Sequence, residues 1–217
     1  MCGRFTLTTT NLDELARGFG AEVEAEIARR YRPRWNIAPT NTHPVLKFED
    51  GVIRVVLARF GVDVPGGRLV INARSETAAE LRTFRQAFQN SRCVVPADGF
   101  FEWQGSRGDR RPQWFHDPAG GLLFFAGLAF KDHEARAFVV LTTPANGLVS
   151  PTHSRMPALL SRDAAHAWLA GPDRALLAPA PDDALVSREV SSLVNDVAND
   201  GPALLDAPAP KRQLTLV

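Results

Sequence analysis

The sequence has little cysteine and no long hydrophobic run. Its two cysteines, Cys2 and Cys93, are too few for a disulfide scaffold, so we expect a reducing, cytoplasmic setting. No close Cys/His spacing suggests zinc, and we predict neither a metal nor another cofactor. No apolar run approaches the roughly 18 residues of a membrane span, and the start lacks the basic and apolar regions of a secretory signal. These absences argue against a membrane protein.

An excess of charge of either sign is also absent. The formal net charge is +1, and 23% charged with 45% hydrophobic residues is the balance of a globular protein. Basic residues do cluster in "RRYRPRW" (29–35) and "SRGDRR" (106–111). Either cluster alone is compatible with a solvated face, because a nucleic-acid groove needs several basic and stacking groups to converge. The balanced total therefore favours a localised groove over a protein that coats DNA.

The sequence also lacks regular βαβ alternation, a Gly-rich phosphate loop and internal repeats. Strand signals come in pairs instead, and the strongest is a hairpin around Asp50-Gly51. Further pairs are "GFFEWQ" with "PQWFHD", and two strands within 121–145 with a turn at 132–135. We predict an α+β fold in a single domain, residues 1–217. Its strands are mostly antiparallel, in barrel-like or curved sheets, and its helices are peripheral.

Helix capping signals place the helices along the chain. Asn11 is a candidate N-cap with Glu14 at the capping-box position, Ser75 can cap a helix through 78–88, and Ser161 or Asp163 can cap another. We predict helices at 11–20, 22–30, 75–88 and 161–171, a surface connection at 171–182, and late strands at 188–194 and 212–217.

Cys2 stands directly after the initiator methionine, in "MCGR". If Met1 stays, Cys2 is an ordinary thiol. If Met1 is removed, which a small second residue permits, Cys2 carries a thiol and an α-amine two carbons apart. An α-amine has a pKa near 8, so a useful fraction is neutral at pH 7, and a thiol is a strong nucleophile. The second case offers chemistry that no internal cysteine has.

Polar residues interrupt apolar strand patterns at four places. Asn72 follows an apolar strand in "LVINARSET", with Arg74 on the same face if the strand continues. Glu102 lies among aromatic residues, which raises a carboxyl pKa toward that of a general acid/base, although an exposed edge carboxylate fits the same pattern. His153 lies in a Pro-bounded loop, where a catalytic and a plain surface role are both open. Asn36, in "RWNIAPT", is most simply a turn former.

The segments MCGR, WNIAP, NARSET, DGFFEW and THSRMP, in this order, closely resemble the SOS-response-associated peptidase (SRAP) family. Proteins of this family sense abasic sites in single-stranded DNA. The resemblance runs from Met1 to about Leu204. No single tetrapeptide is diagnostic, but the combination of MCGR with NAR-ET and DGF-EW is highly specific.

The resemblance implies that Cys2 is the nucleophile once Met1 is removed, with Asn72, Glu102 and His153 around it. The ring-opened abasic sugar is an aldehyde, which the amine attacks to form a Schiff base before the thiol closes a thiazolidine ring. Glu102 is then the candidate acid/base, His153 assists, and Asn72 positions the amine or the sugar. The positions implied to face DNA are Arg4, Arg74, Arg82, Trp103 and Arg155.

Two departures from the family pattern stand out. The family usually has tryptophans near the second hairpin, where "RFGVDVPGGRL" (59–69) has only Phe60, so base stacking at that edge should differ. The family often has Asp after the loop histidine, where this chain has Ser154. Neither change touches the residues of the core chemistry.

The function that we expect is an abasic-site sensor that crosslinks covalently to single-stranded DNA and protects it in the DNA damage (SOS) response. This enzyme would have lyase-like chemistry, remove Met1 by autoproteolysis, act as a monomer and join the nucleoid only when bound to DNA. Two alternatives remain. One is an N-terminal-nucleophile cysteine peptidase or amidohydrolase. The other is a non-covalent single-strand binder that uses arginines, Trp35 and Trp103.

Overall fold

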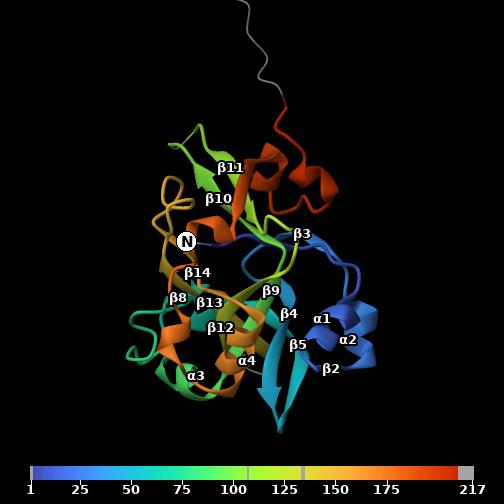
Figure 1. The fold of residues 1–217 in the computed structure, drawn as a ribbon, viewed down its shortest axis with the longest axis vertical. Coiled ribbons are helices and arrows are strands. Elements are labelled where there is room, and N and C mark those ends of the chain that lie inside the picture. The colour runs from blue at the N-terminus through green and yellow to red at the C-terminus, as the bar shows by residue number, and fades with distance from the viewer. Residues whose placement is uncertain (1, 107, 133–134, 210–217) are drawn as a thin grey trace, which may run out of the picture.

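The structure is a computed structural model that describes residues 2–106, 108–132 and 135–209, and two sheets dominate it (Figure 1). The larger has nine strands: β2 (Glu22–Val23), β4 (Thr42–Glu49), β5 (Val52–Phe60), β8 (Asn72–Arg74), β9 (Arg92–Ala97), β12 (Leu123–Asp132), β13 (Ala135–Pro144), β14 (Arg155–Pro157) and β15 (Leu159–Leu160). The smaller has five: β1 (Phe5–Leu7), β3 (Arg34–Ile37), β10 (Gly99–Gln104), β11 (Arg111–His116) and β16 (Val186–Glu189). A separate pair joins β6 (Val62–Val64) to β7 (Arg68–Val70).

Five strands of the larger sheet close into a ring. They pair in the order β4–β5–β13–β12–β9, and β9 pairs with β4 again. Aromatic side chains fill the core, with Phe60 stacked on Phe138 at 5.2 Å between ring centroids. Phe5 of the smaller sheet meets Phe60 and Phe125 edge to face. The two sheets therefore share one core, which begins at the N-terminal strand.

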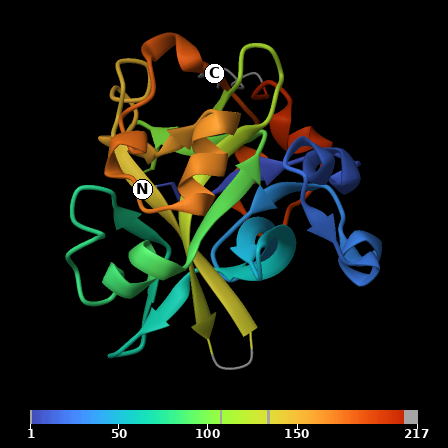
Figure 2. The same ribbon diagram turned by 60° about the horizontal axis from the view of Figure 1, so that its bottom comes forward.

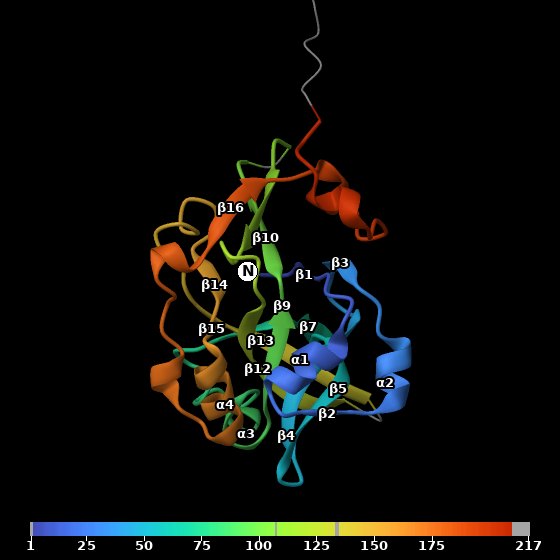
Figure 3. The same cartoon turned by 45° about the vertical axis from the view of Figure 1, so that its right-hand side comes forward.

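The smaller sheet has the strand order β16-β11-β10-β1-β3 and lies at one end of the ring (Figure 3). Its β1 pairs with β10 and β3 on its two sides, so the N-terminal segment enters the middle of the molecule. The C-terminal segment packs against β10 through Val190 and Val194, which bury Phe101.

Helices lie outside the sheets, as Figure 2 shows for those near the ring. They are α1 (Leu12–Gly18), α2 (Ala25–Arg30), α3 (Arg85–Asn90) and α4 (Arg162–Ala170), with 3₁₀ turns at Arg174–Leu176, Asp182–Ala184, Ser192–Asn195 and Pro202–Leu205. Most strand pairs are antiparallel, and the parallel exceptions among the described residues are β2–β5, β5–β13 and β8–β13. The predicted α+β class, with curved antiparallel sheets and peripheral helices, is confirmed.

Local signals in the sequence locate several elements correctly. Asp50 and Gly51 have φ of 51° and 84°, which is the backbone that a two-residue hairpin turn requires. The Asn11 side chain caps α1 by accepting from the Glu14 amide at 3.1 Å. Ser161 caps α4 in the same way, accepting from the Ala164 amide at 3.2 Å.

Other local predictions are wrong. The helix expected from Ser75 through 78–88 is only the short α3, because the Ser75 amide bonds to the Thr142 carbonyl at 2.9 Å and holds this stretch against β13. Asn36 lies inside strand β3 instead of forming a turn. The late strand predicted at 188–194 stops at Glu189.

Two predicted features lie wholly or partly outside the described residues: the strand at 212–217 and the turn at 132–135, of which 133–134 are not described. In the ranges that the structure describes, no helix is long and apolar enough to cross a membrane.

Candidate active site

Cys2 is completely buried where the two sheets meet. Its thiol points back to the carbonyl oxygen of Arg4, with 3.8 Å between Sγ and that oxygen. Its own carbonyl oxygen accepts a hydrogen bond of 3.2 Å from Nδ2 of Asn72, the first residue of β8. The larger sheet therefore holds the Cys2 backbone through Asn72.

Glu102 lies beside Cys2 and is only 5% exposed, so the interpretation as an exposed edge carboxylate is wrong. It belongs to β10, which is flanked by β1 and β11. Burial raises the pKa of the Glu102 carboxyl, and the charge of His153 opposes that rise. Burial also raises the pKa of the Cys2 thiol, as does the negative charge of Glu102. Burial therefore favours the protonated form of both the Cys2 thiol and the Glu102 carboxyl.

His153 approaches Glu102 from the loop between β13 and β14. Its amide donates to the Val149 carbonyl at 3.0 Å, which fixes the loop. Its Nδ1 lies 2.9 Å from the backbone nitrogen of Arg155 and 3.1 Å from the carbonyl oxygen of the same residue, so two contacts to Arg155 orient the ring.

A hollow of about 520 Å³ adjoins this group of residues. Gly3, Glu102 and His153 line it, while Cys2 is buried next to it. A second hollow, of about 590 Å³, shares three of its lining residues, which are Arg4, Trp103 and Arg110. The two hollows are therefore adjacent, and we call them together the Trp103 groove.

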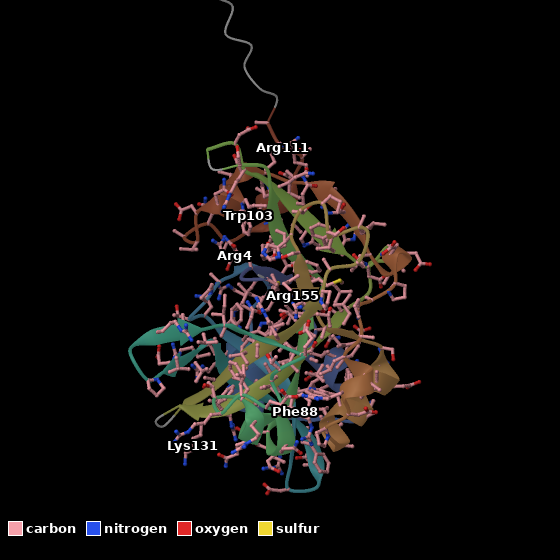
Figure 4. All side chains as sticks on the ribbon, turned by 90° about the vertical axis from the view of Figure 1, so that its left-hand side faces the viewer. Arg4, Phe88, Trp103, Arg111, Lys131 and Arg155 are labelled. Carbon is pink, nitrogen blue, oxygen red and sulfur yellow. The ribbon has the colours of Figure 1, made fainter. Side chains whose placement is uncertain are left out.

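Arg4 and Trp103 form the wall common to both hollows. One guanidinium nitrogen of Arg4 donates to Oδ1 of Asn36 at 2.6 Å and to the Val194 carbonyl at 2.8 Å, and its guanidinium carbon lies 5.6 Å from the Trp103 ring centroid. The indole N–H of Trp103 donates to Oδ1 of Asn195 at 2.6 Å. These contacts hold both side chains in place, and Figure 4 shows Arg4 and Trp103 near each other.

Arg155 is held by an ion pair. Two nitrogens of its guanidinium donate to the carboxylate of Glu76, and the distance from Nη2 to Oε2 is 2.8 Å. Nη2 also donates to the carbonyl oxygen of Thr142. The hydrogen bond with Arg155 lowers the pKa of Glu76 to about 2. This arginine therefore already has an anionic partner, and it anchors the strand that follows His153.

The other predicted arginines lie in different surroundings. Arg74 is exposed at the end of β8 and forms no ion pair with any residue that the structure describes. Arg82 lines a separate hollow with Lys131. Lys131 lies toward the opposite end of the molecule from Trp103 in Figure 4. Because Arg82 lines the same hollow as Lys131, it does not join Cys2, Asn72, Glu102 and His153, which we call the Cys2 group.

Sequence reasoning missed the roles of two residues, one that lines the groove and one buried behind it. Arg110 lines both hollows and comes from the basic cluster 106–111, whose charge was the available signal. Asn36 is fully buried and bridges Arg4 to the C-terminal segment, donating to the carbonyls of Asp196 and Asn199 at 3.0 and 2.8 Å. No local pattern indicates that role, because its partners lie about 160 residues further along the chain.

A larger hollow of about 810 Å³ lies at one mouth of the strand ring. Its charges are largely engaged with one another, since Glu49 pairs with Lys47 at 2.8 Å and with Arg136 at 3.1 Å. No three or more His, Cys, Asp or Glu side chains of the described ranges are grouped so as to hold a metal ion. The candidate chemistry therefore stays with the Cys2 group.

Comparison with known proteins decides the family. The model of the family "SOS response associated peptidase (SRAP)" matches residues 1–197. This chain belongs to the SRAP family.

Relatives that cover nearly the whole chain agree with this assignment. It is 31% identical to abasic site processing protein YoaM of Bacillus subtilis, over 95% of this chain and 98% of that protein. It is 30% identical to abasic site processing protein YedK of Escherichia coli, over 94% and 99% of the two chains. A crystal structure of a Bacteroides thetaiotaomicron protein shares the fold, with a TM-score of 0.78 at 20% identity over 95% of this chain and 99% of that one.

Proposed function

We propose that this SRAP protein processes abasic sites in single-stranded DNA by forming a covalent thiazolidine crosslink through Cys2. The observation that carries the proposal is the meeting of Cys2, Asn72, Glu102 and His153, from four distant segments, beside one hollow. The names of its relatives as abasic site processing proteins support the choice of substrate.

The reaction requires Met1 to be removed first. Hydrolysis of the Met1–Cys2 peptide bond consumes one water and leaves Cys2 with a free α-amine. The name of the family supports a peptidase activity. We propose that the protein carries out this step itself, with Glu102 and His153 as the proton carriers next to the bond.

The crosslink itself forms in two steps. The α-amine attacks the aldehyde carbon of the open sugar, and loss of one water gives a Schiff base. The Cys2 sulfur then bonds to the same carbon, the imine electron pair moves to nitrogen, and the thiol proton follows it through Glu102. One water leaves in total, and no other leaving group is needed.

The arginines supply affinity in this proposal. Arg74, Arg4 and Arg155 hold phosphates near Cys2, Arg82 holds one where the strand extends to the separate hollow that Arg82 lines, and Trp103 provides a surface on which a base can stack. The exposed position of Arg74 supports this role most directly. For Arg155, a phosphate would have to replace the carboxylate of Glu76.

A denaturing gel tests the proposal. Protein incubated with an oligonucleotide that carries one abasic site should give a covalent band, and Cys2→Ala should give none. The same variant should still shift undamaged single strands in a native gel. A band from Cys2→Ala, or non-covalent binding without any band from the wild type, would contradict the proposal, and the latter would favour the non-covalent binder.

A further inference from the structure

The half of the Trp103 groove furthest from Glu102 and His153 has no part in the chemistry described above. Its hollow of about 590 Å³ is lined by Arg4, Trp103, Gly108, Arg110 and Asn195. This volume is within the range of roughly 300–1,000 Å³ of small-molecule sites. It shares Arg4, Trp103 and Arg110 with the hollow that Glu102 and His153 line, so the two hollows are neighbours.

Arg110 differs from Arg4 and Arg155 in having no side-chain partner among the described residues. It is exposed, and it forms no ion pair or hydrogen bond with any residue in the described ranges. Arg4 and Arg155, by contrast, already donate to Asn36 and Glu76. Arg110 is therefore the cation of this groove that can take up an anion without first breaking a contact.

The backbone of the hairpin loop fixes where Arg110 lies. Gly105 has a φ of 101°, and a Cβ atom there would come within 2.6 Å of the carbonyl oxygen of Asp109. Only glycine fits this close approach, and it brings the two ends of the loop together just before Arg110.

We propose that this second hollow is a subsite for the nucleotide next to the abasic sugar, and that Arg110 binds its phosphate. The base stacks on Trp103, whose indole is held by Asn195, and the phosphodiester lies at the Arg110 guanidinium. The proposal rests on the proposed function, because that function is what places the strand in the groove.

Arg111 provides a matched control for Arg110. It is the next residue, carries the same charge and belongs to the same hairpin, but it pairs with Glu189 at 3.5 Å and lines neither hollow. Figure 4 shows it beyond Trp103 at the end of the molecule. If DNA binding depends only on the total positive charge, replacing either arginine weakens it equally. If Arg110 binds a phosphate, only the replacement of Arg110 does so.

The test measures non-covalent binding of an undamaged oligothymidine by fluorescence anisotropy over a series of salt concentrations. Arg110→Ala should reduce the slope of log K against log salt by about 0.7, the value for one phosphate on a single strand. Arg110→Lys should keep most of the slope, and Arg111→Ala should keep all of it. Gly105→Ala, which retains every charge but distorts the loop, should lose affinity as Arg110→Ala does.

An unchanged slope in Arg110→Ala, or an equal loss in Arg111→Ala, would overturn the subsite. The outcome is separable from the crosslinking chemistry. A wild type that forms no covalent band but loses slope in Arg110→Ala would refute the proposed reaction alone. A wild type that crosslinks while Arg110→Ala keeps its slope would refute the subsite alone.

Discussion

The side-chain amide of Asn72 donates a hydrogen bond of 3.2 Å to the carbonyl oxygen of Cys2, across 70 residues of sequence. This contact ties β8 of the large sheet to the segment that leads into β1 of the small sheet. It fixes the backbone atoms that carry both proposed nucleophiles. The position of the Cys2 amine and thiol therefore depends on the packing of the two sheets as well as on the terminus itself.

Asn72→Ala should slow crosslinking by up to about 10²-fold, because small displacements of reacting groups cost that much. Affinity for undamaged single strands should stay the same. A time course on a denaturing gel measures the rate. Asn11→Ala, which removes the cap of α1, should lower stability by about 1 kcal/mol without slowing the reaction. Equal rates for wild type and Asn72→Ala would show that the hydrogen bond does not position Cys2.

Glu102→Gln should slow both formation and reversal of the crosslink by about 10²–10⁴-fold, the usual contribution of a general acid/base. Glutamine keeps the size of the side chain but cannot transfer the proton. The same group serves both directions, so one variant affects both rates. Glu189→Gln, which changes a carboxylate on β16 of the same sheet, is the control. Wild-type rates in Glu102→Gln would show that His153 or solvent, and not Glu102, transfers the proton.

Glu76→Gln should lower the free energy of unfolding at pH 7, and the loss should shrink as the pH falls. The pKa of Glu76 is about 2 in the folded protein, against an ordinary 4.5. An acid with a depressed pKa stabilises the fold above its unfolded pKa and loses that effect between about pH 4.5 and 2. Urea unfolding at pH 7 and pH 3 measures the difference.

Glu80→Gln is the control for Glu76→Gln, because it breaks an exposed ion pair with Arg174 that should contribute about 0–1 kcal/mol. The Arg155 side chain is only 15% exposed, so the Glu76 pair should matter more. A loss in Glu76→Gln that is independent of pH would rule out the ion pair as its cause.

Arg74→Ala should reduce the salt slope for single-stranded DNA by about 0.7, as expected for one lost phosphate contact. Arg155→Ala should reduce it less, because Glu76 already neutralises Arg155 in the free protein. Arg82→Ala measures whether DNA reaches the hollow that Arg82 shares with Lys131. A larger loss for Arg155→Ala than for Arg74→Ala would show that phosphate displaces Glu76 completely.

Short-range chemistry explains what could be read from the sequence. The Asp50-Gly51 turn and the caps at Asn11 and Ser161 depend on neighbouring residues alone, and all three are confirmed. The aromatic surroundings of Glu102 also predicted correctly that burial raises the pKa of its carboxyl.

Long-range contacts explain what could not be read. The helix expected from Ser75 gives way to a hydrogen bond with Thr142, which lies on a strand 67 residues away. The pairing of Arg155 with Glu76 and the bridging role of Asn36 likewise join segments that no local pattern connects. Arg82 follows Asn72 closely in the sequence, yet it lines a different hollow from the one beside Cys2.

The most direct test of the account is the mass of the crosslinked N-terminal peptide. Trypsin cuts after Arg4, so the adduct should be recovered on the tripeptide Cys2-Gly3-Arg4. We predict the mass of this tripeptide plus the abasic nucleotide fragment minus one water, with Met1 absent and no free thiol. An adduct on a peptide that still carries Met1, or on any residue other than Cys2, would contradict the account.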